Sequence, residues 1–185
     1  MSLMLLVLSI ATAHADCERI KKTRPFVENA RASENIRLLN AVVEVQQKSG
    51  VSGTVEVCEI GPSSLPSFYA RSDSSQSHSV WAHQGLVELF NDQELHAVLA
   101  HEFGHVRLGN LKRKPKGWDD PIRQEVSADK FAARLYGAEA MHSALVKLVQ
   151  EFKDSFVPQL YSRSGYALVV PQEELRARLK ALASH

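Results

Sequence analysis

The segment HEFGH, residues 101–105, places two histidines four residues apart with a glutamate directly after the first. It lies in a stretch that is typical of a helix, because Asn91 followed three residues later by Glu94 forms a capping box. On a helix, His101 and His105 stand one above the other on the same face, so their imidazoles can converge on one point. Glu102 is offset by one residue and does not belong to that pair. The fold must therefore contain a helix that carries both histidines on one face.

The same stretch has an apolar face that can be buried against the rest of the protein. Gly109 is expected to end the helix. The apolar face consists of Leu95, Val98, Leu99, Phe103 and Val106.

Two histidines at this spacing are typical of one half of a zinc site, in which Glu102 acts on a water molecule without being a ligand itself. A third ligand is needed, and Glu125, the first residue of EVSAD, can supply a carboxylate oxygen. Asp129 lies one turn further along the same face, where it can accept a hydrogen bond from the second ring nitrogen of a ligating histidine. The alternative is a buried polar network of the same two histidines and two carboxylates.

The segments HEFGH and EVSAD resemble the His-Glu-x-x-His and Glu-x-x-Ala-Asp motifs of the HtpX and CAAX-prenyl-protease-like metallopeptidases, which are gluzincins. The similarity is specific from about Val80 to Gly137 and is continuous over GLVELFNDQELHAVLAHEFGHVRLGN, residues 85–110. It implies a zincin-like domain that binds one Zn²⁺ per chain. By position in the motifs, His101, His105 and Glu125 are expected to be the zinc ligands. Glu102 is expected to be the general base, and the carboxylate of Asp129 is expected to be the hydrogen-bond partner of His101.

Two features depart from the family pattern. No transmembrane helix is evident, so the chain resembles the soluble exported members. The usual Pro-Gly before the strand is replaced by SSQSHSVWA, residues 74–82.

The activity that the resemblance implies is hydrolysis of peptide bonds within protein or peptide substrates. Glu102 is expected to take a proton from the attacking water and to pass it to the leaving amine. Gluzincins typically bind the substrate backbone as an added strand on a sheet edge, and SHSVWA, residues 77–82, is the expected edge. Trp81 is expected to pack in the core rather than line a subsite. Candidate donors to the developing oxyanion are Tyr136, His142, Tyr161, Arg163 and Tyr166.

Two other functions are compatible with the same fold and the same zinc site. The chain can be a zinc-binding chaperone or interaction module with little peptidase activity, although an intact Glu102 argues against this. It can also be a latent zymogen, in which the segment from Asp16 to Arg24 or the tail near His185 occludes the cleft.

Composition sets the scale of the fold. The chain has 185 residues, of which 44% are hydrophobic, and this is enough for one domain with a proper core. Its formal net charge of +1 gives no reason to expect a nucleic-acid partner. Residues 16–185 are expected to form a single metallopeptidase domain whose oligomeric state the sequence does not define.

The remaining pattern predicts an α+β fold that is mostly helical with a small sheet. Residues 26–49 carry Ile36, Leu39, Val42 and Val43 at helical spacing before Gly50. Residues 54–60 and 78–82 alternate like strands, whereas residues 61–77 are rich in Ser, Pro and Gly and are expected to form a long loop. Further helices are expected at residues 85–90, from Asp120 as N-cap to about Gly137, and at 138–152 and 171–182.

The N-terminus reads as a secretory signal peptide, residues 1–15. Its apolar core runs from Leu3 to Ile10, and Ala13 and Ala15 fit the small-residue cleavage pattern. The run is shorter than the roughly 20 residues that span a bilayer, although an uncleaved N-terminal anchor is the alternative. The mature chain is therefore expected to begin at Asp16, to make no stable membrane insertion, and to be periplasmic or secreted.

The chain has two cysteines, Cys17 and Cys58. In an oxidising compartment they can pair and tie the new N-terminus to the domain. They can instead remain separate thiols, with Cys58 buried in a strand, and Cys17 can block the metal as a thiolate in a latent form.

The other polar features have ordinary interpretations. His78, His83, His96 and His142 are expected to be surface or hydrogen-bonded histidines rather than ligands. The segment RKPKGWDD, residues 113–120, is expected to be a solvated loop between the two metal-binding helices, with a lid or a contact with an anionic envelope as alternatives.

Overall fold

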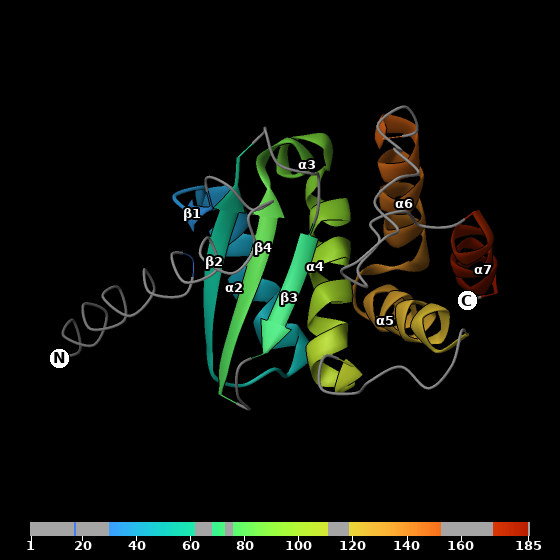
Figure 1. Cartoon of the computed structure of the whole chain (residues 1–185), viewed down its shortest axis with the longest axis horizontal. Helices are drawn as coiled ribbons and strands as arrows, with labels where there is room; N and C mark the ends of the chain where they lie inside the picture. Colours follow the sequence, from blue (N-terminus) through green and yellow to red (C-terminus); the bar gives the residue numbers. More distant parts are fainter. Residues whose placement is uncertain are drawn as a thin grey trace, which may run out of the picture.

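The computed structural model describes Cys17 and residues 30–61, 68–72, 76–110, 119–152 and 172–184. These residues form an α+β fold that is mostly helical, as the sequence predicted (Figure 1). In chain order the elements are β1 (Arg31–Ala32), α2 (Ile36–Ser49), β2 (Thr54–Ile60), β3 (Phe68–Ser72), β4 (Ser77–His83), α3 (Gln84–Leu89), α4 (Asp92–Arg107), α5 (Asp119–Tyr136), α6 (Ala138–Phe152) and α7 (Gln172–Ala183). Within the described part of the chain, no helix is both long enough and apolar enough to cross a bilayer.

The sheet has the strand order β1-β2-β4-β3. Strand β2 runs parallel to β4, and β1 and β3 are antiparallel to their neighbours. The predicted strands at 54–60 and 78–82 are therefore confirmed as β2 and β4. The prediction of an uninterrupted loop over residues 61–77 is wrong, because β3 lies inside it and pairs with β4. A five-residue strand with polar flanks has little periodicity of its own, and its pairing depends on β4.

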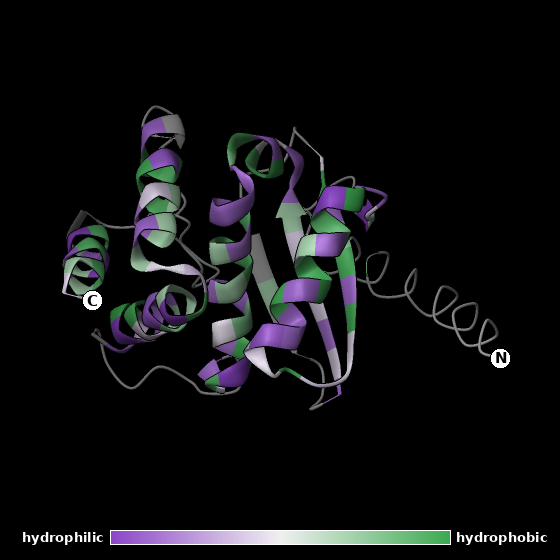
Figure 2. Ribbon diagram, turned by 180° about the vertical axis from the view of Figure 1, so that it is seen from behind, coloured by the Kyte–Doolittle hydropathy of each residue, from purple (hydrophilic) through white to green (hydrophobic). Residues whose placement is uncertain are grey.

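The two faces of the sheet contribute to two separate clusters, because side chains alternate along a strand. Val57, Val80 and Ala82 face the helices and join the main core. Trp81 and Cys58 face the other way, in a smaller cluster that also contains Ile60, Ala30 and Cys17. Trp81 is thus a packed core residue, as expected. Helix α2 lies on the helical side of the sheet, behind it in Figure 1 and in front of it in Figure 2.

Helix α2 ends before Gly50, as the sequence predicted, but its start and its buried face differ from the prediction. Helical spacing was expected from residue 26, whereas α2 begins at Ile36 and residues 31–32 form β1, which pairs with β2. Asn35 accepts a hydrogen bond from the backbone of Leu38, and Gly50 closes the helix with φ 67°. The buried side chains are Leu38, Ala41, Val42 and Val45. Ile36 and Val43, which the sequence analysis assigned to the apolar face, are 68% and 54% exposed. The assignment was wrong because α2 packs through the stripe that contains Leu38, Ala41 and Val45, and spacing alone does not reveal which of two adjacent apolar stripes is covered.

Helix α4 begins with the predicted capping box. Asn91 accepts a hydrogen bond from the backbone N–H of Glu94, and Glu94 accepts one from the backbone N–H of Asn91. Leu95, Leu99 and Phe103 are buried in the core. The helix packs against α2, β3, α5 and α6, and therefore occupies the centre of the molecule (Figure 1).

The boundaries of the later helices agree closely with the predicted ones. Helix α5 ends before Gly137, which has φ 93°, and α6 covers the predicted residues 138–152. Asp120 was predicted as the N-cap of α5, but it is the second residue of the helix and is buried. The helix starts two residues earlier than the sequence indicated, at Asp119 rather than Pro121, a difference within the usual uncertainty of helix ends.

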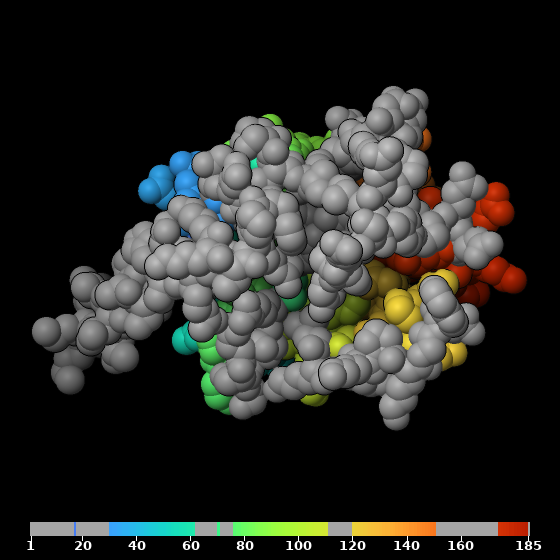
Figure 3. All heavy atoms as spheres, in the orientation of Figure 1, coloured from blue at the N-terminus to red at the C-terminus, as the bar shows by residue number. Residues whose placement is uncertain are grey.

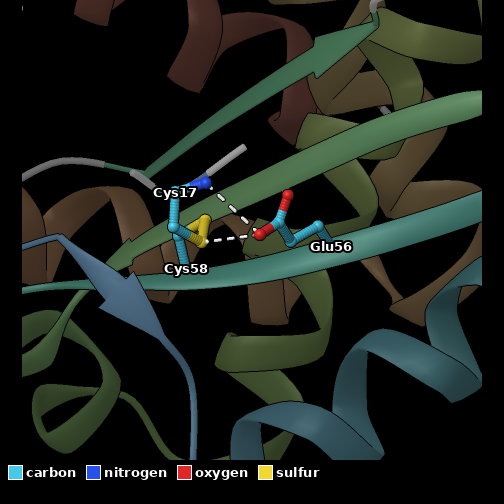
Figure 4. Close-up of a disulfide and its surroundings, with 3 residues drawn as sticks. All are labelled: Cys17, Glu56 and Cys58. Carbon is cyan, nitrogen blue, oxygen red and sulfur yellow. Dashed lines mark hydrogen bonds between the residues drawn. A yellow bond between two sulfur atoms is a disulfide. The ribbon is translucent and has the colours of Figure 1, made fainter. Parts of the chain in front are cut away.

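Cys17 and Cys58 are joined by a disulfide, and both residues are buried (Figure 4). The backbone N–H of Cys17 also donates to the Glu56 carboxylate at 3.3 Å. The link spans 41 residues and fixes this part of the N-terminal segment to β2. Of the alternatives open from the sequence, the structure therefore contains the paired form.

Reduction of this disulfide is expected to lower the free energy of unfolding by about 2–4 kcal/mol, because the reduced unfolded chain gains conformational freedom. Denaturant titration with and without reductant measures the effect, and a Cys17→Ser/Cys58→Ser double variant should not respond to reductant. Two free thiols in the unfolded, unreduced protein would contradict the pairing.

The buried carboxylate of Glu94 joins α4 to α6. It accepts hydrogen bonds from Ser143 Oγ and Lys147 Nζ, both at 2.6 Å, in addition to the bond from Asn91. Burial alone would raise the pKa of Glu94, but these three donors outweigh it and lower the pKa below its ordinary value. The group therefore stabilises the fold above pH of about 4.3, and the contribution is lost as pH falls through the lowered pKa.

Glu94→Gln is expected to lower the free energy of unfolding by about 1–3 kcal/mol at pH 7, because an amide cannot replace the charge-assisted acceptor. The exposed Glu88, in α3, offers the matched control Glu88→Gln, which should change stability by less than about 0.5 kcal/mol. Urea titrations at pH 7 and pH 3 measure both variants. The deficit of Glu94→Gln should shrink at pH 3, and an equal deficit at both pH values would contradict the assignment.

Candidate metal centre

Helix α4 presents His101 and His105 one turn apart on one face. Their Nε2 atoms lie 3.0 Å from each other, and both side chains are largely buried. The rings meet edge to face, with centroids 4.7 Å apart. The two histidines therefore converge on one point, as their spacing predicted.

Helix α5 adds Glu125 to the same point. One carboxylate oxygen of Glu125 lies 3.3 Å from His101 Nε2, and the other lies 3.3 Å from His105 Nε2. The three ligand-type groups all lie within 4.8 Å of one another. The structure thus brings together all three residues that the sequence analysis named as zinc ligands.

The close approach of α4 and α5 depends on Gly104, which lies between the two histidines. A Cβ at this position would lie 3.3 Å from the Cα of Ala128 and 3.2 Å from Cδ1 of Phe131. Both distances are shorter than ordinary van der Waals contacts between carbons. Glycine at this position therefore lets the two helices that carry the donor atoms lie close together.

The spacing of the three donors fits a tetrahedral zinc ion. Ligands at 2.0–2.1 Å in tetrahedral positions are separated by about 3.3 Å, close to the distances between these side chains. The surroundings also favour a cation. Burial disfavours a charge on His101, but Asp129 and Glu125 outweigh burial and raise the pKa of His101 to about 10. Two imidazoles and one carboxylate are a donor set that zinc accepts, so the residues present fit the metal.

A second group of possible donors consists of Cys17, Glu56 and Cys58. Its two sulfurs are bonded to each other, so neither is a thiolate that could bind a metal. The Cys17–Cys58 pair also lies on the face of the sheet opposite to α4, which excludes the idea that Cys17 blocks the histidine site in this form.

Glu102 lies beside the donors but takes no part in their contacts. Its Oε2 accepts a hydrogen bond from the backbone N–H of Ala70, in β3, at 2.8 Å. Burial raises the pKa of Glu102 above its ordinary value. A buried glutamate whose pKa is raised is a stronger base than an exposed one and is suited to accept a proton from a water molecule at a metal site.

Asp129 holds His101 in one orientation. His101 Nδ1 lies 2.8 Å from Asp129 Oδ1, and the side chain of Asp129 is fully buried. When Nδ1 carries the proton of this hydrogen bond, Nε2 has its lone pair free for a metal. On His105 the corresponding Nδ1 lies 3.3 Å from the side-chain amide of Asn110.

The sequence analysis missed Arg178, in α7, which contacts both carboxylates. It hydrogen-bonds Asp129 twice and lies 3.1 Å from Glu125 Oε2. A signal was available, because Arg178 interrupts the apolar stripe of Leu175, Leu179 and Leu182 on a short helix. Ala70 was also missed, and its backbone contact had no signal in the sequence.

Other predicted residues lie away from the centre or outside the described residues. Tyr136 faces α2 and α4, where its ring stacks on His96 and its hydroxyl donates to Glu44, so it is no oxyanion donor here. His142 is exposed on α6. Tyr161, Arg163, Tyr166 and most of the 113–120 segment lie outside the described residues.

The remaining predicted histidines are hydrogen-bonded or buried rather than ligating. His78 Nε2 lies 3.1 Å from the carbonyl oxygen of Ser52, and His96 lies 3.2 Å from the Glu44 carboxylate. His83 is buried at the end of β4. None of them joins the centre formed by His101 and His105.

Comparison with known proteins supports the resemblance. Residues 33–114 match peptidase family M48. The chain is 37% identical over 76 residues to "Protease HtpX" of Acinetobacter baumannii (strain AYE), covering 40% of this chain and 24% of that protein. It is 33% identical over 89 residues to "Protease HtpX" of Cellvibrio japonicus (strain Ueda107), covering 46% and 29%. The matches confirm the predicted resemblance to the HtpX-like metallopeptidases.

These matches have a limited extent. The chain spans about a quarter of the length of the HtpX proteins that it matches. The family M48 match contains His101, Glu102 and His105 but ends before α5. Glu125, Asp129 and Arg178 are therefore assigned to the centre by the structure and the EVSAD motif, not by that match.

Gly104→Ala is expected to weaken zinc binding by about tenfold, because the added methyl group pushes α5 and Glu125 away from α4. The crowding between α4 and α5 also lowers the free energy of unfolding. The higher helix propensity of alanine, worth about 1 kcal/mol relative to glycine, should offset most of this loss. Competition with a chelator measures the affinity.

Gly50→Ala provides a contrast for this experiment. Gly50 has φ 67° with open space around it, so the substitution strains the end of α2 without touching the centre. It should cost about 1 kcal/mol of stability and leave zinc affinity unchanged. Equal zinc affinities for Gly104→Ala and the wild type would show that the close helix packing is not needed.

Proposed function

We propose that this chain is a zinc-dependent endopeptidase of the HtpX-like type. The observation that carries the proposal is the convergence of His101, His105 and Glu125 at 3.0–3.3 Å with Glu102 beside them. The match to a peptidase family over the same helix supports the reaction class. A buried polar network alone would not require three donor atoms at the spacing of a zinc site or a glutamate left outside them.

His101, His105 and Glu125 would hold the ion. Bound there, zinc supplies a Lewis acid that activates a water molecule and polarises the scissile carbonyl. Asp129 keeps the ring of His101 oriented through the hydrogen bond to Nδ1. The fully buried position of Asp129 protects this bond from competition with water.

Glu102 is the proposed general base. Its carboxylate takes the proton of the attacking water and then delivers it to the nitrogen of the leaving amine. The hydrogen bond from Ala70 holds one oxygen, Oε2, against β3, which leaves Oε1 for the water. Burial raises the pKa of Glu102 above its ordinary value, which makes the carboxylate a stronger base toward the water proton.

The proposed substrate strand pairs with β3 rather than with β4. The prediction that SHSVWA forms the edge is wrong, because β4 lies between β2 and β3 in the sheet. The N–H of Ala70 points away from β4 toward Glu102, so by antiparallel alternation the backbone groups of Phe68, Ala70 and Ser72 face the free edge. An extended peptide that adds to this edge passes beside Glu102.

The proposed setting is outside the cytoplasm. Residues 1–15 have the pattern of a signal peptide and lie outside the described residues. The disulfide between Cys17 and Cys58 agrees with an oxidising compartment. We therefore propose a periplasmic or secreted enzyme that acts on protein or peptide substrates.

The test compares purified wild-type protein with Glu102→Gln for zinc content and for cleavage of casein. Both proteins should hold about one zinc per chain, and Glu102→Gln should lose about 10²–10⁴-fold of the cleavage rate. Glu88→Gln should match the wild type in both measurements. If both proteins bind zinc and neither cleaves, the binding-module or zymogen function is favoured, and activity that appears after limited proteolysis identifies the zymogen. A wild type that binds no zinc would contradict the proposal.

A further inference from the structure

Arg178 is a charged side chain buried at the back of the proposed zinc site. It lies on α7, which packs against α5 and α6, and only 7% of its side chain is exposed. In the space-filling view, α4, α5 and α7 follow one another across the right half of the molecule (Figure 3). A buried arginine is rare unless it is fully paired, so its partners indicate why it is there.

Both oxygens of Asp129 are bound by this guanidinium. Nε donates to Oδ2 at 2.7 Å, and Nη2 donates to Oδ1 at 2.8 Å. The second of these oxygens is the one that lies 2.8 Å from His101 Nδ1. The two parallel bonds fix the plane of the carboxylate, and with it the direction in which Oδ1 meets the His101 ring.

The third nitrogen of the same guanidinium reaches the ligand carboxylate. Nη1 lies 3.1 Å from Glu125 Oε2, the oxygen that faces His101 Nε2. Glu174, one turn earlier on α7, lies 3.5 Å from the same Nη1. Glu125 is 28% exposed, so without this contact its side chain could turn toward solvent and leave the histidines.

We propose that Arg178 is a positioning residue of the metal centre, holding the ligand Glu125 and the His101 partner Asp129 in the orientation that zinc binding requires. The inference rests on the zinc site of the proposed function. Arg178 acts through two carboxylates of α5, Asp129 and Glu125, rather than through the histidines themselves. The guanidinium charge also compensates the two carboxylate charges, which lie in a largely buried site and would otherwise repel each other.

The matched variants are Arg178→Gln, Arg178→Lys and the control Arg176→Gln. Arg176 lies on the same helix and is exposed. Lysine keeps the charge but cannot make the two parallel bonds to Asp129, whereas glutamine loses both features. If the Arg178→Gln variant does not fold, the same measurements on Arg178→Lys test the proposal.

Two readouts separate positioning from a merely structural role. Chelator competition gives the zinc dissociation constant of the folded protein, and the visible spectrum of the Co²⁺-substituted protein reports the ligand geometry. Urea titration of the metal-free protein gives stability separately. We expect Arg178→Gln to raise the zinc dissociation constant by about 10–100-fold and Arg178→Lys to raise it by a smaller factor, each with a changed Co²⁺ spectrum. Arg176→Gln should match the wild type.

The proposal is overturned if the folded Arg178 variants bind zinc within twofold of the wild type with an unchanged Co²⁺ spectrum, even when their stability falls. Arg178 would then only attach α7 to α5. A wild type that binds no zinc overturns both this inference and the proposed function. A wild type that binds zinc but cleaves nothing contradicts the peptidase function alone, and the zinc affinities of the variants still decide the role of Arg178.

Discussion

The close packing of α4 against α5 is the constraint on which the candidate centre depends. The two histidines lie on one helix and the carboxylates Glu125 and Asp129 lie on the other, so a small change in helix separation alters every distance between a histidine and a carboxylate. Gly104 permits this separation because a side chain there would meet the backbone of α5. The capping box fixes the start of α4, and the buried side chains of α4 hold the helix against the core.

Close packing also creates an electrostatic cost. Burying Glu125, Asp129 and Glu102 near one another is unfavourable unless positive groups face them. Arg178 and the imidazole of His101 provide this compensation, and they hold the pKa of Asp129 below its ordinary value although burial works to raise it. Such a network is weak evidence for stability, and it is better explained by the need to fix ligands. The centre therefore extends beyond the helix that carries the histidines to the last helix of the chain.

Much of the fold followed from local pattern. The end of α2 at Gly50, the capping box of α4, the end of α5, both ends of α6, and the strands β2 and β4 were predicted, because capping and periodicity act over a few residues. The predictions failed where contacts between residues distant in the sequence determine the structure. β3 depends on pairing with β4, and the exposure of Ile36 and Val43 depends on which stripe of α2 meets α4 and the sheet. The interior position of β4 could not be inferred without knowing that a strand lies beyond it.

The sequence by itself determined that His101, Glu102 and His105 share one helix, and that Glu125 and Asp129 share another, since 3.6 residues per turn fixes which side chains share a face. Only the tertiary structure decided that the two faces meet, and that Ala70 and Arg178 join them. Ala70 is 32 residues from Glu102, and Arg178 is 49 residues from Asp129. Contacts over such separations depend on how helices and strands pack, and no local spacing rule encodes them.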